Sequence, residues 1–231
     1  QLLGVRMRFI QKIKNLYSNL VKLPQKLEII QEALGRIESR QVASAESKIF
    51  DDVEFQVYSQ WGEDGIIQYL LRNIRIDNKK FIEFGVENYT QSNTRFLLKN
   101  NNWSGLVIDG SNKNVEYIKN DPIYWLHNLK AVQAFITKDN INELFVKNGL
   151  HGDIGLLSID IDGNDYWVWQ AIDSISPRII ICEYNSRFGS KLKLTTPYDE
   201  KFIRSEAHYS NLYYGASIAA LVDLGNQKGY Q

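Results

Sequence analysis

Cysteine is almost absent from this sequence of 231 residues. The single cysteine, Cys182, cannot form a disulfide within the chain, so the sequence favours a reducing compartment and we expect a cytoplasmic protein. No apolar run is long enough to span a bilayer. Neither sign of charge dominates, because 27 basic side chains balance 27 acidic ones. This balance argues against a general nucleic-acid binder, which is usually basic.

The 44% hydrophobic content suits one globular domain plus an appendage, and we expect domains at residues 1–45 and 46–231. In the first, apolar residues recur in steps of four and three, the a/d pattern of a coiled-coil seam. These residues are Phe9, Ile13, Leu16, Leu20, Leu23, Leu27, Ile30, Leu34 and Ile37. Pro24 interrupts the pattern and should kink the helix or start a second helix after Leu23.

Three roles are open for this N-terminal helical extension. It can join copies of the chain into a homo-oligomer, or it can pack on its own domain. Its first half carries only basic charges before Glu28, so it can also lie on an anionic membrane surface. Membrane contact would place the protein at the inner face of the cytoplasmic membrane.

The rest of the chain is organised around residues 80–111. Residues 81–84 are typical of a buried strand that turns at Gly85. A helix-length segment and a second strand at 106–108 follow, and that strand ends at Asp109. This order predicts a βαβ unit. Ligands of open α/β sheets bind beyond the carboxyl ends of the strands, so Glu83, Gly85 and Asp109 should share one crevice.

The turn after the first strand favours a cationic ligand. A dinucleotide site needs G-x-G-x-x-G, whereas residues 85–89 contain one glycine. Carboxylates at Glu83 and Glu87 would repel a pyrophosphate and attract a cation. S-adenosylmethionine carries a sulfonium and an ammonium without phosphate, and Asp109 is placed to accept hydrogen bonds from its ribose hydroxyls. Alternatively, Glu83 caps a turn and Asp109 starts a loop.

Further strands are predicted at 131–137 and 178–182, and helices at 66–73, 114–120, 141–148 and 216–224. Ser59 or Asp64 can cap the helix at 66–73, whereas Gln60 and Trp61 can close over a cofactor. A strand beginning at Ile154 becomes acidic at its carboxyl end. Alternation of strand side chains should place Asp160 and Asp162 on one face.

Glu183 follows the strand at 178–182, so it should meet Asp160 and Asp162. Such close carboxylates repel one another unless a cation or a shared proton intervenes. They can therefore act as a general base with its supports, or bind Mg²⁺ or a similar hard cation. The alternative is loop solvation with helix capping by Asp162 and Asp165.

The segment after Tyr184 is rich in aromatic and polar side chains, which suits stacking and hydrogen bonding with a sugar acceptor. The same residues can equally be the packing of an irregular cap. His208 in this segment is a candidate base or metal ligand.

Four phrases, in order, carry a family resemblance: YSQWGEDGII, FIEFGVENYTQSNTRFL, LLSIDIDGNDYWVW and HYSNLYYGASIAAL. The chain from Phe55 to Tyr230 resembles class I S-adenosylmethionine (SAM)-dependent methyltransferases of an FkbM-related group, which is found in bacterial surface-polysaccharide clusters. The resemblance implies an α/β fold with a Rossmann-like sheet and helices on both faces. It also implies a SAM pocket lined by Glu83, Gly85, Ser92, Asn93, Thr94, Asp109, Gly110, Ser111 and Asp160.

The implied reaction is O-methylation of a sugar or sugar-linked group, with a small molecule or glycan as acceptor. Asp160, Asp162, Glu183 or His208 would take the acceptor's proton, or Asp160, Asp162 and Glu183 would bind a divalent ion such as Mg²⁺. Family members usually end in a β-hairpin that this sequence lacks, so we expect the hairpin to be missing. Two rival functions are a metal-dependent hydrolase or lyase using the same carboxylates, and a non-catalytic methyltransferase-like scaffold.

Overall fold

The computed structural model of the chain describes residues 2–44 and 49–230, and for residues 2–10 and 13 the backbone alone. Contacts divide the chain into two compact units, one of residues 1–57 and 61–70, the other of residues 58–60 and 71–231. The boundary near residue 45 stays a prediction. No described helix has the length and apolar character needed to cross a membrane.

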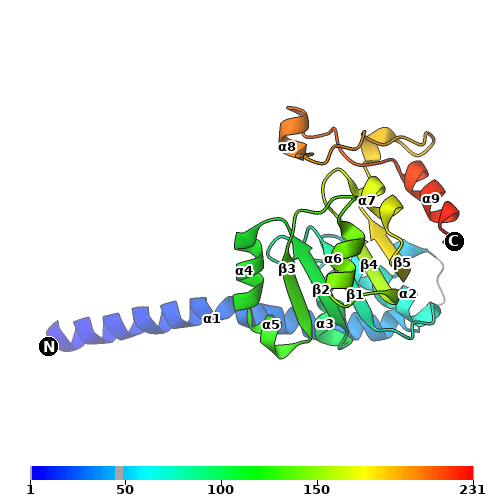
Figure 1. Cartoon of the computed structure of the whole chain (residues 1–231). Coiled ribbons are helices and arrows are strands. Elements are labelled where there is room, and N and C mark those ends of the chain that lie inside the picture. The colour runs from blue at the N-terminus through cyan, green and yellow to red at the C-terminus, as the bar shows by residue number, and fades with distance from the viewer. Residues whose placement is uncertain (1, 45–48, 231) are drawn as a thin grey trace. The chain divides into compact units, whose positions relative to one another are not determined.

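The first unit is built on one long helix, α1 (Leu2–Val42), labelled in Figure 1. Pro24 lies inside it, and the helix continues to Val42. The prediction of a second helix after Leu23 is therefore wrong. Proline removes one backbone hydrogen bond and costs a helix interior about 3 kcal/mol, which the rest of the helix must offset. Within the unit, the Gln31 side chain donates to the Val57 carbonyl and Ser39 Oγ donates to Gln68 Oε1 at 3.1 Å.

A short 3-10 helix, η1 (Phe50–Asp52), precedes α2 (Glu63–Asn73). α2 starts before the predicted residue 66, so Asp64 lies in its first turn, where Oδ2 accepts from the Val57 N–H at 2.8 Å. Gly65 allows a close approach, because a Cβ there would lie 2.1 Å from the Val53 carbonyl oxygen. Asp64 thus anchors the preceding loop to the helix.

The second unit contains a five-stranded parallel sheet in the order β3-β2-β1-β4-β5 (Figure 1). The strands are β1 (Lys80–Phe84), β2 (Ser104–Asp109), β3 (Leu129–Gln133), β4 (Gly152–Ile159) and β5 (Ile175–Cys182). The helices are α3 (Arg95–Asn100), α4 (Asn112–Asn120), α5 (Pro122–Leu126), α6 (Ile141–Lys147), α7 (Asp165–Ala171), α8 (Arg204–Ala207) and α9 (Ile218–Gln227). A second 3-10 helix, η2 (Ser186–Phe188), follows β5. This strand order confirms the predicted Rossmann-like arrangement. From β1, the chain adds β2 and β3 on one side and then β4 and β5 on the other, so the order of the parallel strands switches sides between β1 and β4.

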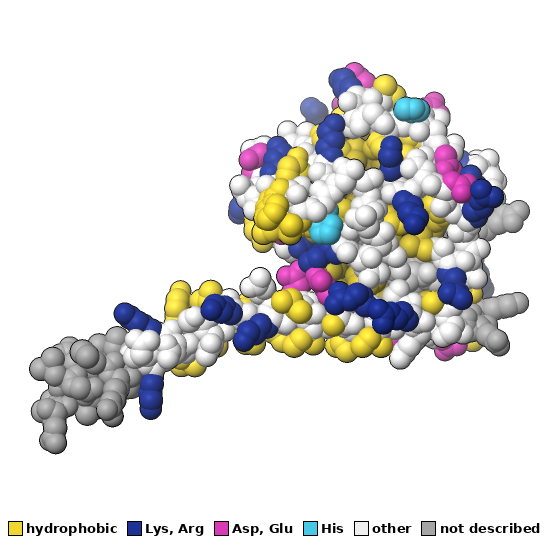
Figure 2. Space-filling view, turned by 90° about the horizontal axis from the view of Figure 1, so that it is seen from below, with side chains coloured by type: hydrophobic (Ala, Val, Ile, Leu, Met, Phe, Trp, Pro, Cys, Tyr) yellow, Lys and Arg dark blue, Asp and Glu magenta, His cyan; other side chains and the backbone are white. Residues whose placement is uncertain are grey.

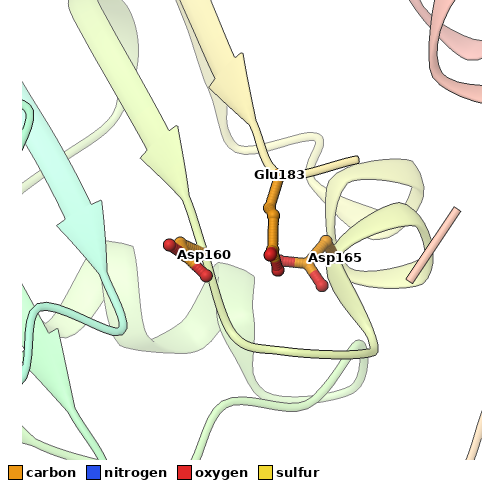
Figure 3. A group of neighbouring side chains, drawn as sticks. All are labelled: Asp160, Asp165 and Glu183. Atoms are coloured by element: carbon orange, nitrogen blue, oxygen red, sulfur yellow. The ribbon is translucent and has the colours of Figure 1, made fainter. Parts of the chain in front are cut away.

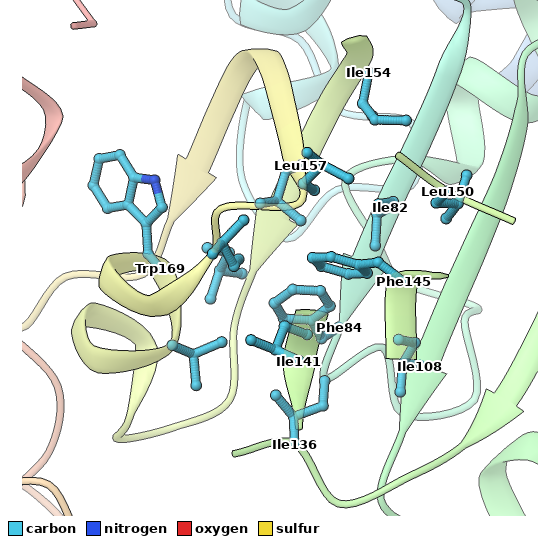
Figure 4. Close-up of a cluster of buried hydrophobic side chains, with 14 of the residues drawn as sticks. Ile82, Phe84, Ile108, Ile136, Ile141, Phe145, Leu150, Ile154, Leu157 and Trp169 are labelled. Atoms are coloured by element: carbon cyan, nitrogen blue, oxygen red, sulfur yellow. The ribbon is translucent and has the colours of Figure 1, made fainter. Parts of the chain in front are cut away.

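The central strands β1, β2 and β4 are buried on both faces over most of their length, as expected for parallel strands, whereas the edge strands β3 and β5 alternate buried and exposed residues. On one face, strand residues such as Ile82, Phe84 and Leu157 pack in a core with residues from α6, α7 and α9 (Figure 4). The Phe84 and Phe145 rings stack there with centroids 6.0 Å apart. The alternate strand residues, including Phe81, are also buried, as is the apolar face of α3.

The third strand differs from its prediction. We expected residues 131–137, whereas β3 covers Leu129–Gln133. The backbone after Ala134 leaves the sheet because Thr137 and Asn140 exchange hydrogen bonds. The Thr137 N–H donates to Asn140 Oδ1 at 2.9 Å, and the Asn140 N–H donates to Thr137 Oγ1 at 3.2 Å. This pair of residues stabilises the turn that precedes α6.

A long connection follows β5 and ends at α9. The helix predicted at 216–224 begins later, at Ile218, because the Ser217 side chain caps it by accepting from the Ala220 N–H at 3.2 Å. Between residues 183 and 230, the described backbone adds no strand to the sheet and makes one isolated bridge, Thr195 to Ala216.

Candidate functional site

The carboxyl ends of β1 and β4 meet at the point where the strand order reverses. Phe84 pairs with Ile159, so the next residues, Gly85 and Asp160, lie side by side. Gly85 has a φ of +70°, and a Cβ there would lie 1.5 Å from the Asp160 carbonyl oxygen. No side chain fits in that space. Glycine at 85 is therefore required for β1 to turn at this edge of the sheet.

Glu83 is buried just inside this turn, where it organises the loop that leads into α3. Its Oε1 accepts from the Asn93 N–H at 2.9 Å, and its Oε2 accepts from the Thr94 N–H at 3.1 Å and from Thr94 Oγ1 at 2.5 Å. Burial raises the pKa of Glu83, and these hydrogen bonds lower it in part. Ser92 is buried, and Asn93 Nδ2 donates to Ser158 Oγ at 3.1 Å. Glu83 thus fixes the loop residues of the predicted pocket.

Asp109 ends β2 and connects two loops at the same edge. Its Oδ2 accepts from the Glu87 N–H at 2.8 Å. Its Oδ1 accepts from the Ser111 N–H at 2.8 Å and from Asn114 Nδ2 at 3.0 Å. A carboxylate has about four lone-pair sites, so these three bonds leave capacity for one further donor. Gly110 and Ser111, beside it, are exposed.

A carboxylate cluster lies next to this edge, formed by Asp160, Asp165 and Glu183 (Figure 3). One oxygen from each lies within 4.8 Å of the others. Asp160 follows β4, Glu183 follows β5, and Asp165 is the first residue of α7. Asp165 is fully buried and is held by the Ile161 and Gly163 N–H groups at 2.8 and 2.9 Å.

The three carboxyl groups hold protons more tightly than usual. Desolvation, followed by repulsion from Asp165, Asp162 and Glu83, raises the pKa of Asp160 to about 7, although this residue keeps contact with solvent. Desolvation, followed by repulsion from Asp160, raises the pKa of Glu183 to about 8. Burial raises the pKa of Asp165 to about 6. The raised pKa values of Asp160 and Glu183 therefore favour retention of a proton by the cluster near neutral pH.

Asp162 differs from its prediction. β4 ends at Ile159 and Asp162 has a φ of +58°, so strand alternation does not apply, and the prediction that it shares a strand face with Asp160 is wrong. The exposed Asp162 carboxylate pairs with Arg204. Arg204 Nη1 also lies 4.0 Å from Glu183 Oε1, and its guanidinium stacks 3.6 Å from the Tyr214 ring centroid. The sequence analysis assigned Arg204 no role.

The connection between β5 and α9 is fixed to the loop that carries these acids. Asn164 Nδ2 donates to the Asp199 carbonyl at 2.7 Å, and Trp167 Nε1 donates to the Thr196 carbonyl at 2.8 Å. Gly163 allows contact with Phe202, since a Cβ there would lie 2.2 Å from that ring. The aromatic segment predicted to receive an acceptor is therefore anchored beside the carboxylate cluster.

Two predicted residues lie on the surface. His208 is exposed, with Nδ1 2.7 Å from Ser210 Oγ and its ring against Tyr209. Gln60 is also exposed. Their predicted roles stay predictions.

Searches against models of protein families and against curated proteins found no match. Among solved structures, the chain is similar to an S-adenosylmethionine-dependent methyltransferase from Clostridium acetobutylicum, with 12% identity and a TM-score of 0.38. It is also similar to the N-terminal domain of EvdMO1 with SAH bound, with 13% identity and a TM-score of 0.42. The matches cover 59% and 65% of this chain, and 56% and 64% of those structures, less than two thirds of their length.

Replacing Glu83 tests its organising role. Glu83→Gln should lower the free energy of unfolding by about 1–3 kcal/mol, because the amide NH₂ would face N–H donors and leave one of them unsatisfied. Urea denaturation measures the change. Glu87→Gln is the matched control, since Glu87 is exposed and contributes only its backbone N–H to the Asp109 contact. Equal stability of the two variants would contradict the role.

The carboxylate cluster predicts a pH dependence of stability. Its three folded-state pKa values lie above those of ordinary carboxyl groups, so the stabilisation is complete below about pH 4 and is lost as the pH rises through about 6 to 8. In buffer with a metal chelator, the melting temperature should fall between about pH 5 and pH 8, and less so in Asp160→Asn. Asp153→Asn, at the other end of β4, should keep the wild-type slope. A variant-independent slope would contradict the prediction.

Proposed function

We propose that this protein is a SAM-dependent methyltransferase that O-methylates a sugar or sugar-linked group of a surface glycan. The observation that carries the proposal is the edge of the sheet at Gly85, where a one-glycine turn lies between Glu83 and Asp109. A pyrophosphate would meet carboxylates there, whereas a sulfonium would be attracted. One of the sequence phrases that resemble the methyltransferase group includes Glu83 and Gly85.

The residues at this edge fit the cofactor. Asp109 would accept from a ribose hydroxyl with its remaining lone pair, as the three existing hydrogen bonds hold the carboxylate still. Gly110 would leave room beside it, since the nearest atom to a Cβ at that residue is 3.8 Å away. Bound SAM would supply a methyl group on a positively charged sulfur. The loop that Glu83 holds, with Ser92, Asn93 and Thr94, would form the adjacent wall.

Asp160 is the best placed proton acceptor. It lies at the carboxyl end of β4 beside Gly85, and its raised pKa of about 7 matches the range in which a general base works at neutral pH. Glu183 would receive or return the shared proton, and Arg204 would limit the negative charge around Glu183. Alignment of the acceptor oxygen with the methyl group can supply about 7–11 kcal/mol of barrier lowering, more than the base.

The acceptor would enter from the connection between β5 and α9. Exposed rings there, including Tyr184, Tyr209 and Tyr213, offer apolar faces with hydroxyl groups. This combination suits sugar rings, which present C–H faces and hydroxyl edges.

A second candidate function is metal-dependent hydrolysis or elimination, favoured by the carboxylate cluster. Its oxygen donors are those that Mg²⁺ prefers, with Asp160, Asp165 and Glu183 as the protein ligands. Asp162, predicted as a ligand, instead pairs with Arg204. A bound cation would displace the shared proton and acidify a hydroxyl group.

Calorimetric titration with SAM tests the cofactor. The wild-type protein should bind SAM, and Asp109→Ala should weaken binding by about tenfold or more, since loss of a hydrogen bond to a charged group costs about 1.5–3 kcal/mol. Asp153→Ala should bind as the wild type does. Circular dichroism checks that each variant is folded. Unchanged affinity in folded Asp109→Ala would remove Asp109 from this role, and binding of NAD or Mg²⁺ in place of SAM would overturn the proposal.

Turnover of the Asp160 variant separates binding from chemistry. Asp160→Asn should bind SAM with wild-type affinity and form SAH about 10²–10⁴-fold more slowly with a sugar acceptor, because the amide cannot take the proton. Asp173→Asn, an exposed position after α7, serves as the control. Wild-type turnover in Asp160→Asn would exclude Asp160 as the base.

A further inference from the structure

The apolar face of α1 is exposed, whereas a helix that packs on its own domain would bury it. A surface helix normally buries its apolar stripe. In α1, the buried or half-buried side chains of residues 28–42 are mostly small or polar: Glu28, Glu32, Ala33, Gly35, Ser39 and Val42. Leu27, Ile30, Leu34 and Ile37 are instead 47% to 56% exposed. Within the first unit, the described residues therefore leave the apolar stripe uncovered.

The first half of the helix is more open still. Every described side chain from residue 11 to residue 27 is exposed on α1. An isolated helix gains little stability in water without tertiary packing, and this segment also contains Pro24. Packing against another molecule would supply what the segment lacks.

The spacing of the stripe identifies the kind of partner. Seven described seam residues, Leu16, Leu20, Leu23, Leu27, Ile30, Leu34 and Ile37, keep steps of four and three and are 46% to 61% exposed. Figure 2 shows hydrophobic side chains along the surface of this helix. The repeat of 3.5 matches a coiled-coil seam, and a helix lying on a membrane uses a broader apolar face with a period of 3.6. Tyr17, Val21 and Ile29 outside the seam are also exposed.

Charge complementarity identifies the orientation. Residues 11–26 carry Lys12, Lys14, Lys22 and Lys26 without an acidic residue, and residues 28–38 carry Glu28, Glu32 and Glu38 with one arginine. Parallel helices would place the lysine-rich halves together. Antiparallel helices would place each lysine-rich half beside the acidic half of the other. In an alignment centred at residue 25, Lys12 and Lys22 lie level with Glu38 of the partner subunit and Glu28 of the partner subunit, and Lys14 lies level with Arg36 of the partner subunit.

From these observations, we infer that α1 pairs with α1 of a second copy of this chain, as an antiparallel coiled coil. An alignment centred at residue 25 puts Leu16 level with Leu34 of the partner subunit and Leu20 level with Ile30 of the partner subunit. It pairs a positions with d positions throughout, as antiparallel packing requires.

Light scattering after size-exclusion chromatography tests the pairing in the full chain. The wild-type protein should elute with twice the monomer mass. Leu20→Asp should be a monomer, because the seam cannot accommodate an unpaired charge. Ser18→Asp, which adds the same charge on the opposite side of the helix, should stay a dimer. A monomeric wild-type protein would overturn the inference, as would a monomer that binds vesicles containing anionic lipid.

Disulfide trapping tests the orientation. Mixed Leu16→Cys and Leu34→Cys proteins should form a cross-linked dimer under mild oxidation, whereas Leu16→Cys alone should not. The wild-type protein, which contains only Cys182, is the control. Cross-linking of Leu16→Cys with itself would show parallel helices and overturn the antiparallel arrangement.

Discussion

The close approach of Gly85 to the Asp160 carbonyl is the constraint on which the site depends. It follows from the strand order, because β1 and β4 are neighbours and end at the same level. The turn after β1 can pass β4 only without a side chain at residue 85. That passage brings the Glu83 loop, Asp109 and Asp160 to one edge of the sheet. A fold that separated β1 from β4 would disperse the same residues.

Three neighbouring carboxylates are tolerated because each is compensated differently. Two backbone N–H groups hold the buried Asp165, the guanidinium of Arg204 lies near Glu183, and Asp160 retains contact with water. A shared proton removes the remaining repulsion. The repulsion that the surrounding loop does not compensate raises the pKa of Asp160 to about 7. A carboxyl group with that pKa can exchange a proton near neutral pH. The same compensation explains why Asp162, one turn away, faces outward to Arg204 instead of joining the cluster.

The sequence predicted the strands well and the cluster in part. Buried apolar runs identify β1, β2 and β4 because central parallel strands need apolar side chains on both faces, and the apolar residues 179–182 identify the edge strand β5. β3 was placed too late, since Thr137 and Asn140 exchange hydrogen bonds in a turn that the strand-like composition of this segment conceals. Asp165 was read as a helix cap, and its bonds to Ile161 and Gly163 do hold the loop, but its distance to Glu183 depends on how β5 lies beside β4. No pattern within a short stretch of the sequence predicts the distance between Asp165 and Glu183. Arg204 was overlooked for the same reason, as it reaches Asp162 across 42 residues.

The loop between β4 and α7 joins the two regions that the proposed reaction needs. Asp165 faces inward to the cluster, while Asn164 and Asp162 hold the connection that carries the exposed tyrosines. An acceptor that displaced this connection would also move Arg204 away from Glu183. Loss of that positive charge would raise the pKa of Glu183. Glu183 would then hold the proton of the cluster, and Asp160 would be left to accept another. Arg204 thus connects the segment between β5 and α9 to the proton affinity of the cluster, since it contacts both Asp162 and Glu183.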